Sequence, residues 1–172
     1  VLKWLAISLP VSLLIGSASA LLLVSLNLVT DYREANHYII AALPLAGLVI
    51  GLMYHYLGGD VGRGNNYLID EIHKPFRMAP LVYIGIVLTH LFGGSAGREG
   101  TGVQMGGAIA DQFSKLFRLK PRDRKILVVM GISGGFASVF GTPLAGAVFA
   151  LEVIIMGRMR YEAILPSFFA AA

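Results

Sequence analysis

A glycine-rich stretch, GGSAGREGTGVQMGG at residues 93–107, decides the fold of this chain because it interrupts a long apolar sequence. It contains seven glycines, and we expect a helix to begin near Gly100. The first N–H groups of a helix have no partner within the helix, and its N-terminus carries partial positive charge. The turn is therefore a candidate anion-binding site, formed by Arg98, Gly100 and Thr101 around the helix start.

Glu99 lies at the same predicted helix start. Its carboxylate is itself an anion, so it can occupy the position of a dissolved halide. Burial favours the protonated acid, whereas a helix N-terminus favours the carboxylate. A side chain balanced between the two can bind and release a proton, which would make Glu99 both a gate and a proton carrier. The alternative is a structural carboxylate that caps its own helix or pairs with Arg98, although carboxylates inside membranes are functional by default.

The composition around this stretch is that of a membrane protein. Of the 172 residues, 56% are hydrophobic and only 14% are charged, against about 25% charged in a soluble domain. A bilayer crossing takes about 20 apolar residues, and several of the apolar runs are shorter or are interrupted by Gly or Pro. Broken helices persist in lipid only inside protein or beside a cavity, so we expect an all-α polytopic protein with broken and re-entrant helices. The predicted runs are Trp4 to Leu28, Tyr38 to Tyr56, Tyr67 to Ile72, Ala79 to Phe92, Val103 to Phe117, Ile126 to Val139, Leu144 to Met156, and Tyr161 onward.

Charge indicates the orientation of these helices. Basic residues concentrate in cytoplasmic loops of membrane proteins, which accounts for the net charge of +4 without nucleic acid. With the N-terminus inside, Arg33 falls outside and Arg98 lies in a turn of its own. The predicted cytoplasmic residues are Lys3, Arg63, Lys74, Arg77, Lys115, Arg118, Lys120, Arg122, Arg124, Lys125, Arg158 and Arg160.

The ends and the cysteine content complete this picture. Residues 5–28 lack the arrangement of a cleaved signal peptide. The first residue is Val1 and the chain stops inside an apolar run, so we expect residues 1–172 to be cut at both ends from a longer protein. There is no cysteine, which excludes disulfides and thiolate metal sites in this chain.

Two further glycine-containing segments are predicted to interrupt the helices. Residues 62–66, GRGNN, lead into a short helix, and Gly64, Asn65 and Asn66 are predicted to bind the anion through amide donors and close backbone approach. An ordinary turn with an Asn N-cap is the alternative. The third break combines residues 133–136, SGGF, with a helix start at Pro143. The small residues after that start, Ala145 and Gly146, favour helix packing.

The chain resembles the CLC chloride channel and transporter family in two strings. The first is GREG at 97–100 with VQ at 103–104 and GG at 106–107; the second is PLAG at 143–146 with Phe149 and Glu152. The resemblance implies the N-terminal half of a CLC-type transmembrane domain. It also implies a homodimer whose subunits each have a pore, built from two inverted halves with helix N-termini meeting at dehydrated anion sites. Glu99 matches the external gating glutamate of the family, and the second-half helix N-terminus and pore tyrosine have no counterpart here.

Departures from the family pattern leave the transported ion open. Thr101 stands where a proline is usual, and Asn65 best matches the central serine of the first anion loop, with Arg63 as the alternative in another alignment. Val153 stands where proton-coupled chloride exchangers carry an internal glutamate. The combination of Asn65 at the central position and no internal carboxylate resembles the fluoride/proton antiporter branch of the family. We expect the protein to be a chloride channel or halide/proton antiporter, or alternatively a fluoride-specific fluoride/proton antiporter. We expect it to cross the bacterial inner membrane several times.

Two other classes of protein compete with transport. An enzyme would use Gly100 and Gly102 with Gly106 or Gly107 as a dinucleotide fingerprint, but that motif needs a strand before it and a βαβ unit. A non-transporting scaffold would have the same hydropathy but gives no reason for a carboxylate in a glycine-rich turn. We therefore expect no enzymatic activity, no cofactor and no metal. The histidines have no metal-ligand spacing: His37, His55, His73 and His90.

Overall fold

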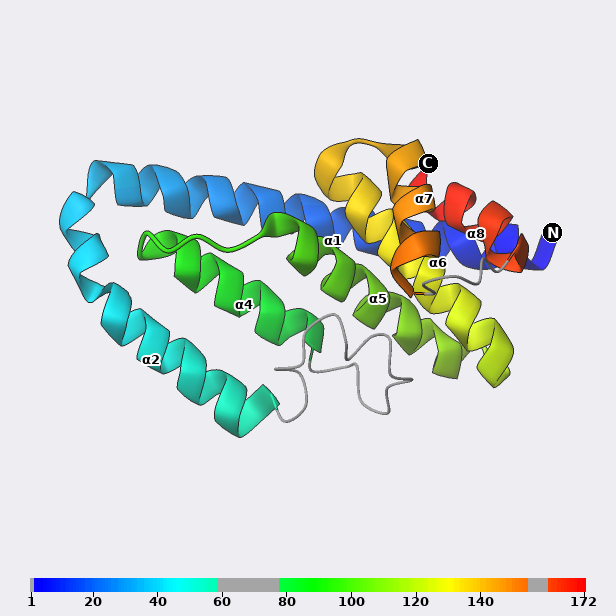
Figure 1. The fold of residues 1–172 in the computed structure, drawn as a ribbon, viewed down its shortest axis with the longest axis horizontal. Coiled ribbons are helices and arrows are strands. Elements are labelled where there is room, and N and C mark those ends of the chain that lie inside the picture. Colours follow the sequence, from blue (N-terminus) through cyan, green and yellow to red (C-terminus); the bar gives the residue numbers. More distant parts are fainter. Residues whose placement is uncertain (1, 59–77, 155–160) are drawn as a thin grey trace.

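The computed structural model of the chain describes residues 2–58, 78–154 and 161–172, which form helices and short turns with no strand in these ranges (Figure 1). This agrees with the predicted all-α class. The helix order is α1 (Leu2–Ala35), η1 (His37–Ala42), α2 (Leu43–Met53), η2 (Tyr54–Gly58), α4 (Met78–Leu91), α5 (Arg98–Leu116), α6 (Pro121–Phe140), α7 (Pro143–Ile154) and α8 (Tyr161–Ala171).

The first helix, α1, runs along one side of the molecule for 34 residues, or about 50 Å at 1.5 Å per residue. Pro10 lies within it without ending it. Its buried residues recur at helical spacing and face α4, α5, α6 and α8: Ile7, Val11, Ile15, Leu22 and Leu26. The opposite face exposes further leucines, including Leu9, Leu13, Leu21 and Leu28. A helix that is apolar on both its packed and its exposed face is suited to lipid.

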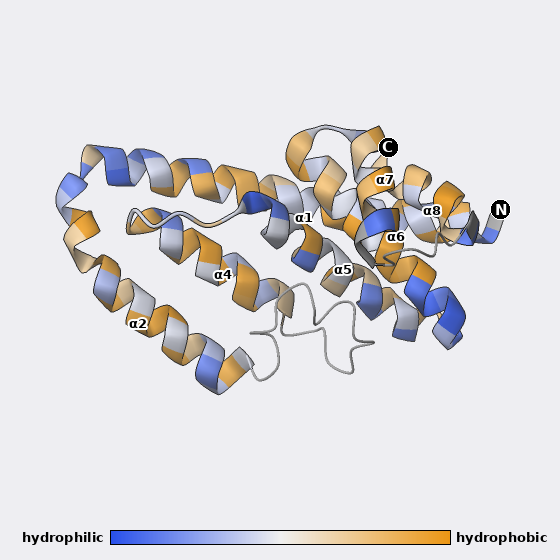
Figure 2. Ribbon diagram, viewed as in Figure 1, coloured by the Kyte–Doolittle hydropathy of each residue, from blue (hydrophilic) through white to orange (hydrophobic). Residues whose placement is uncertain are grey.

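The second predicted run is three helical segments in place of one α-helix. It begins as the 3₁₀ helix η1, continues as α2 with Pro44 in its first turn, and ends as the π-helix η2. Proline is favoured in a first turn, so Pro44 marks a helix start inside the run. The stretches Lys3–Ala35 and His37–Gly58 are each long and apolar enough to cross a bilayer. Figure 2 shows α2 and α4 as largely hydrophobic, whereas α5 and α6 both begin with hydrophilic residues.

Helices α5 and α6 pack with their backbones in contact through glycines spaced four residues apart. A Cβ atom added at Gly102 would lie 2.9 Å from the Gly135 carbonyl oxygen, and one at Gly106 would overlap the Gly131 carbonyl. Small residues at this spacing are typical of close helix contacts in membranes. Residues 133–136 therefore do not break the chain, as the sequence had suggested, because they lie inside α6 and give room to its neighbours.

The third predicted break lies instead at Gly141, which ends α6 in the left-handed conformation with φ 68°. Pro143 then begins α7. The predicted packing role is confirmed for Gly146, where an added Cβ would lie 2.8 Å from the Ser133 carbonyl oxygen of α6. Ala145 is exposed, because the face of α7 that meets α6 carries Gly146, Ala147 and Ala150.

The basic stretch from Lys115 to Lys125 in the sequence indicates a connector, but the connection in the structure is shorter. Residues 115–116 end α5, and Pro121 begins α6, so only residues 117–120 lie between the two helices. Proline at the first position of α6 accounts for the earlier start. The first turn of α6 therefore carries the charged residues 122–125, which fixes the direction of their side chains.

Candidate anion-binding site

The Glu99 turn lies between α4 and α5, partway along the length of α1 (Figure 1). After α4 the chain reverses at Gly93, whose φ is 84°, and the Gly94 N–H donates to the Thr89 carbonyl over 2.8 Å. Residues 95–97 then run back along α1 without regular structure before α5 begins at Arg98. The sequence had placed this helix start near Gly100, two residues later.

The start of α5 presents backbone donors that no side chain of the described residues caps. Gly97 is the N-cap, with φ −70° and ψ 123°, and no side chain of the cap accepts a hydrogen bond from the first turn. The N–H groups of Arg98, Glu99 and Gly100 precede the first possible bond within the helix. Together with the helix dipole they form the arrangement that binds anions in proteins.

Glu99 is exposed at this end, and its carboxylate folds back toward the cap. A Cβ added at Gly97 would lie 3.0 Å from Oε2 of Glu99, so the absence of a side chain at residue 97 gives the carboxylate its place. Arg98 is also exposed, and within the described residues neither side chain makes an ion pair or a hydrogen bond. The alternative in which Glu99 pairs with Arg98 is not the arrangement seen.

Thr101 plays a different part from the one predicted. Its side chain is buried and its hydroxyl donates to the Gly97 carbonyl over 3.1 Å. The hydroxyl is thus engaged with the N-cap and does not offer a hydrogen bond to an anion. It stabilises the backbone at the start of α5, where the three preceding N–H groups have no partner within the helix.

The second predicted loop falls outside the part of the chain that the structure describes. Gly64, Asn65 and Asn66 belong to residues 59–77, as do Arg63 and His73. Their role in anion binding stays a prediction from the sequence. Among the described residues, no three His, Asp or Glu side chains group as metal ligands.

The enzyme alternative meets a different local structure from the one it needs. Gly100, Gly102 and Gly106 all lie within α5, and the segment before α5 is an irregular turn that follows another helix. A dinucleotide fingerprint places its first glycines in a turn between a strand and a helix. In this chain Gly102 and Gly106 instead bring α5 against α6.

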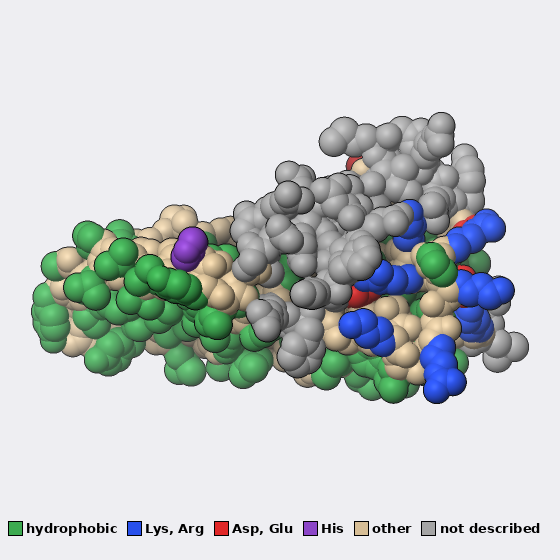
Figure 3. All heavy atoms as spheres, turned by 90° about the horizontal axis from the view of Figure 1, so that it is seen from below, with side chains coloured by type: hydrophobic (Ala, Val, Ile, Leu, Met, Phe, Trp, Pro, Cys, Tyr) green, Lys and Arg blue, Asp and Glu red, His purple; other side chains and the backbone are tan. Residues whose placement is uncertain are grey.

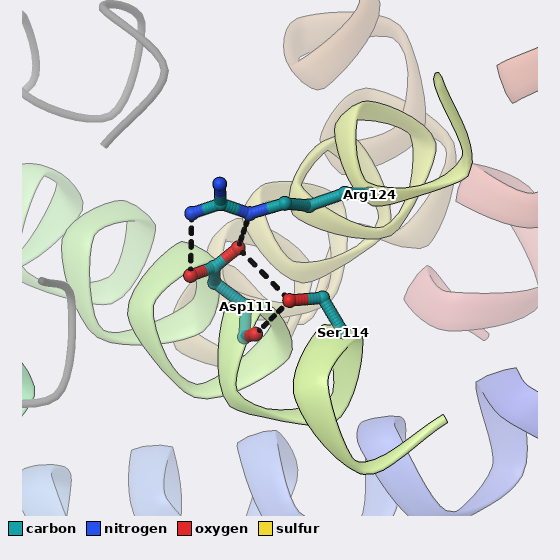
Figure 4. Close-up of polar contacts among 3 residues, drawn as sticks. All are labelled: Asp111, Ser114 and Arg124. Atoms are coloured by element: carbon teal, nitrogen blue, oxygen red, sulfur yellow. Dashed lines mark hydrogen bonds and ion pairs between the residues drawn. The ribbon is translucent and has the colours of Figure 1, made fainter. Parts of the chain in front are cut away.

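A buried ion pair at the other end of α5 was not predicted from the sequence. Asp111 is 2% exposed, and its two carboxylate oxygens accept hydrogen bonds from Nε and Nη2 of Arg124 at 2.5 and 2.9 Å (Figure 4). The Ser114 hydroxyl donates to the Asp111 carbonyl over 2.6 Å. The sequence does carry a signal for this pair: Asp111 lies on the apolar face of an amphipathic helix. A carboxylate buried there needs a cation or a hydrogen-bond donor as its partner.

Three successive residues at the start of α6 bind three different helices. Arg122 pairs with Glu162 of α8, Asp123 pairs with Lys3 of α1 over 2.5 Å, and Arg124 pairs with Asp111 of α5. These contacts hold together the end of the bundle opposite the η1–α2 corner. Glu99 lies at the other end of α5, so this one helix connects its turn to the charged end.

The fold and the sequence match known proteins. The chain is 57% identical over 174 residues to a chloride/fluoride channel protein of Pseudomonas syringae pv. tomato, covering 98% of this chain and 38% of that protein. It is 40% identical over 134 residues to a proton/chloride exchange transporter of Vibrio vulnificus, covering 72% of this chain and 27% of the relative. Among solved structures, a CLC-type fluoride/proton antiporter superimposes with a TM-score of 0.91 at 35% identity, over 98% of this chain and 44% of that one.

The chain thus spans less than half the length of these relatives. The family model described as the voltage gated chloride channel matches residues 46–172. Because that match runs from α2 to α8 and includes the Glu99 turn, the chain belongs to the voltage-gated chloride channel (CLC) family of integral membrane proteins.

Proposed function

We propose that the protein carrying this chain moves halide ions across a membrane, and that Glu99 is its gate and proton carrier. The observation that supports this most is the start of α5, where, among the described residues, Glu99 has no partner and no side chain caps the first three backbone N–H groups. A halide and the carboxylate compete there for the same donors. When Glu99 takes up a proton it loses its negative charge and is attracted less strongly to those N–H groups, so a halide can take its place. Proton binding and anion binding are therefore coupled.

Residues 1–172 would form the N-terminal half of a CLC-type transmembrane domain, in a homodimer of the bacterial inner membrane. The likeness to 44% of a fluoride/proton antiporter supports this extent, and the bacterial relatives support the location. The anion site would then be completed by residues of a second half, together with Gly64, Asn65 and Asn66. Counting labelled subunits in vesicles by photobleaching tests the dimer: single bleaching steps alone would contradict it.

Fluoride is the second candidate substrate, and two independent observations favour it. The solved structure at 35% identity is that of a CLC-type fluoride/proton antiporter, and the Pseudomonas relative is named for both chloride and fluoride. In the sequence, Asn65 stands at the predicted central position and Val153 replaces an internal carboxylate. An amide donor suits a small anion that is hard to dehydrate.

The test uses the full-length protein in liposomes loaded with potassium chloride or potassium fluoride. Ion-selective electrodes measure efflux after a potassium ionophore is added, and an external pH electrode measures coupled protons. Efflux of neither ion would contradict transport and would favour the scaffold alternative. In Glu99→Gln, proton movement driven by the anion gradient should vanish while anion movement persists. Retained proton movement would show that another group carries the proton.

The identity of the ion is tested separately with Asn65→Ser. We expect the preference for fluoride over chloride to fall, because a hydroxyl replaces the amide donor. An unchanged preference would remove Asn65 from the site and leave Arg63 or the second half as the determinant. Asn27→Ser is the matched control, since it makes the same exchange at an exposed position of α1 that is not part of the proposed site.

A further inference from the structure

The last turn of α5 and the connection to α6 carry three cations that have no acidic partner in the part of the chain that the structure describes. Lys115, Arg118 and Lys120 are exposed and make no ion pair among the described residues. Three acidic residues at this end already have partners, because Asp111, Asp123 and Glu162 pair with Arg124, Lys3 and Arg122. We call Lys115, Arg118 and Lys120 the connector cations. Figure 3 shows Lys and Arg side chains gathered at this end of the molecule, while the other end is largely hydrophobic.

Exposed apolar side chains lie between these cations. Leu116 is 71% exposed and Phe117 is 40% exposed. Phe117 stacks on Phe113 with ring centroids 5.9 Å apart, and Phe113 packs against the core, so the ring is held in place. Water solvates cations well but exposed leucine and phenylalanine poorly. Basic residues alternating with exposed apolar ones are typical of a surface in contact with phospholipid.

The backbone of the connector holds Arg118 in a conformation that favours glycine. Its φ is 48°, and the N–H groups of Arg118 and Leu119 close the end of α5 by donating to the carbonyls of Lys115 and Ser114 at 3.2 and 2.9 Å. This is a Schellman motif, in which glycine usually occupies the left-handed residue. An arginine here forgoes that advantage and adds an exposed cation to the short stretch between Lys115 and Lys120. Strain of this kind points from structure to a binding role.

We propose that the connector cations bind the phosphate of an anionic phospholipid, with Leu116 and Phe117 inserted among its acyl chains. Lipid fits this surface because one ligand satisfies both the charges and the exposed apolar side chains. The family is membrane-integral, and an excess of Lys and Arg marks the cytoplasmic side, where the leaflet is negatively charged. The surface lies at the end of α5 opposite Glu99, so it is separate from the proposed anion site.

The test measures lipid retention directly and does not depend on transport. Full-length protein in a neutral detergent is mixed with equal amounts of phosphatidylglycerol and phosphatidylcholine. It is then passed through size exclusion, and the retained lipid is quantified by mass spectrometry. We expect preferential retention of phosphatidylglycerol that weakens in high salt. Each connector cation changed to Gln should lower the preference by about fivefold, so the triple variant should lose it.

Two variants separate binding from folding and from overall charge. Arg118→Gly removes the charge but permits the left-handed backbone, so it should lose preference as Arg118→Gln does while its thermal stability is kept or raised. Arg122→Gln removes a cation that Glu162 already neutralises, and it should keep most of the preference. The proposal is overturned if the wild type retains both lipids equally or if the triple variant keeps its preference. Binding of poly-glutamate without a phosphatidylglycerol preference would overturn it in favour of a soluble acidic partner.

Discussion

The two ends of α5 treat charge in opposite ways. At the N-terminal end, Glu99 and Arg98 are exposed and unpaired within the described residues, and the helix N–H groups have no side-chain acceptor. At the other end, Asp111 is buried and held by two hydrogen bonds from Arg124. A carboxylate that serves the fold is given its partners within the chain. One that is left without partners at a helix start is available to compete with an ion.

Stability measurements on the full-length protein can break or sharpen this contrast. The free energy of unfolding is followed in mixed micelles with increasing dodecyl sulfate. If the contrast is right, substitutions in the contacts that hold α5 in place should lower the free energy of unfolding. Substitution of Glu99 should change transport and leave the free energy of unfolding almost unchanged.

The largest loss is expected where α5 crosses α6. Gly106→Ala should destabilise the protein by about 3 kcal/mol, because the new methyl group overlaps the Gly131 carbonyl and backbone must move. Gly16→Ala is the matched control, since nothing lies within 4 Å of its added Cβ, and it should gain about 0.5–1 kcal/mol. Equal effects at both sites would show that the close contact of α5 and α6 is not needed.

A smaller loss is expected at the paired end. Asp111→Asn should destabilise the protein by about 2 kcal/mol, less than the roughly 3–5 kcal/mol of a fully buried pair, because 32% of the Arg124 side chain stays exposed. Combining it with Arg124→Gln should cost less than the sum of the two single changes. Additive losses would mean that the two side chains stabilise the protein independently.

The pair between Arg122 and Glu162 should matter less. Both side chains are more than half exposed, so Glu162→Gln should change the free energy of unfolding by less than about 1 kcal/mol. The effect should shrink further in 1 M salt, which screens exposed charges. A loss as large as that of Asp111→Asn would place this pair in a buried environment in the whole protein.

The smallest effect on stability is expected at the open end. Glu99→Gln should change the free energy of unfolding by no more than about 0.5 kcal/mol, since only the favourable position of a carboxylate near the helix N-terminus is lost. The same variant is the one expected to abolish proton coupling. A large loss of stability in Glu99→Gln would reverse the contrast between the two ends and make Glu99 a structural residue.

Much of the helical order followed from the sequence, because local signals carry it. Pro143 and Gly141 mark a helix start and a helix end by their own backbone preferences. The 14% charged content requires a membrane environment, and the Glu99 turn is recognisable because glycines and a carboxylate interrupt an apolar run. These features depend on residues that are neighbours in the chain.

Pairings between distant residues were decided only by the tertiary structure. In the sequence Gly135 indicates a break between helices, yet it lies inside α6. There its small size allows the α6 backbone to approach Gly102 of α5 closely. The partner of Asp111 could not be chosen from the sequence, since several cations lie between residues 115 and 125 and only the packing of α5 on α6 selects Arg124. The direction of the Thr101 hydroxyl depends likewise on the cap at Gly97. Local backbone preference sets where helices begin and end, whereas contacts across helices require the whole bundle to be assembled.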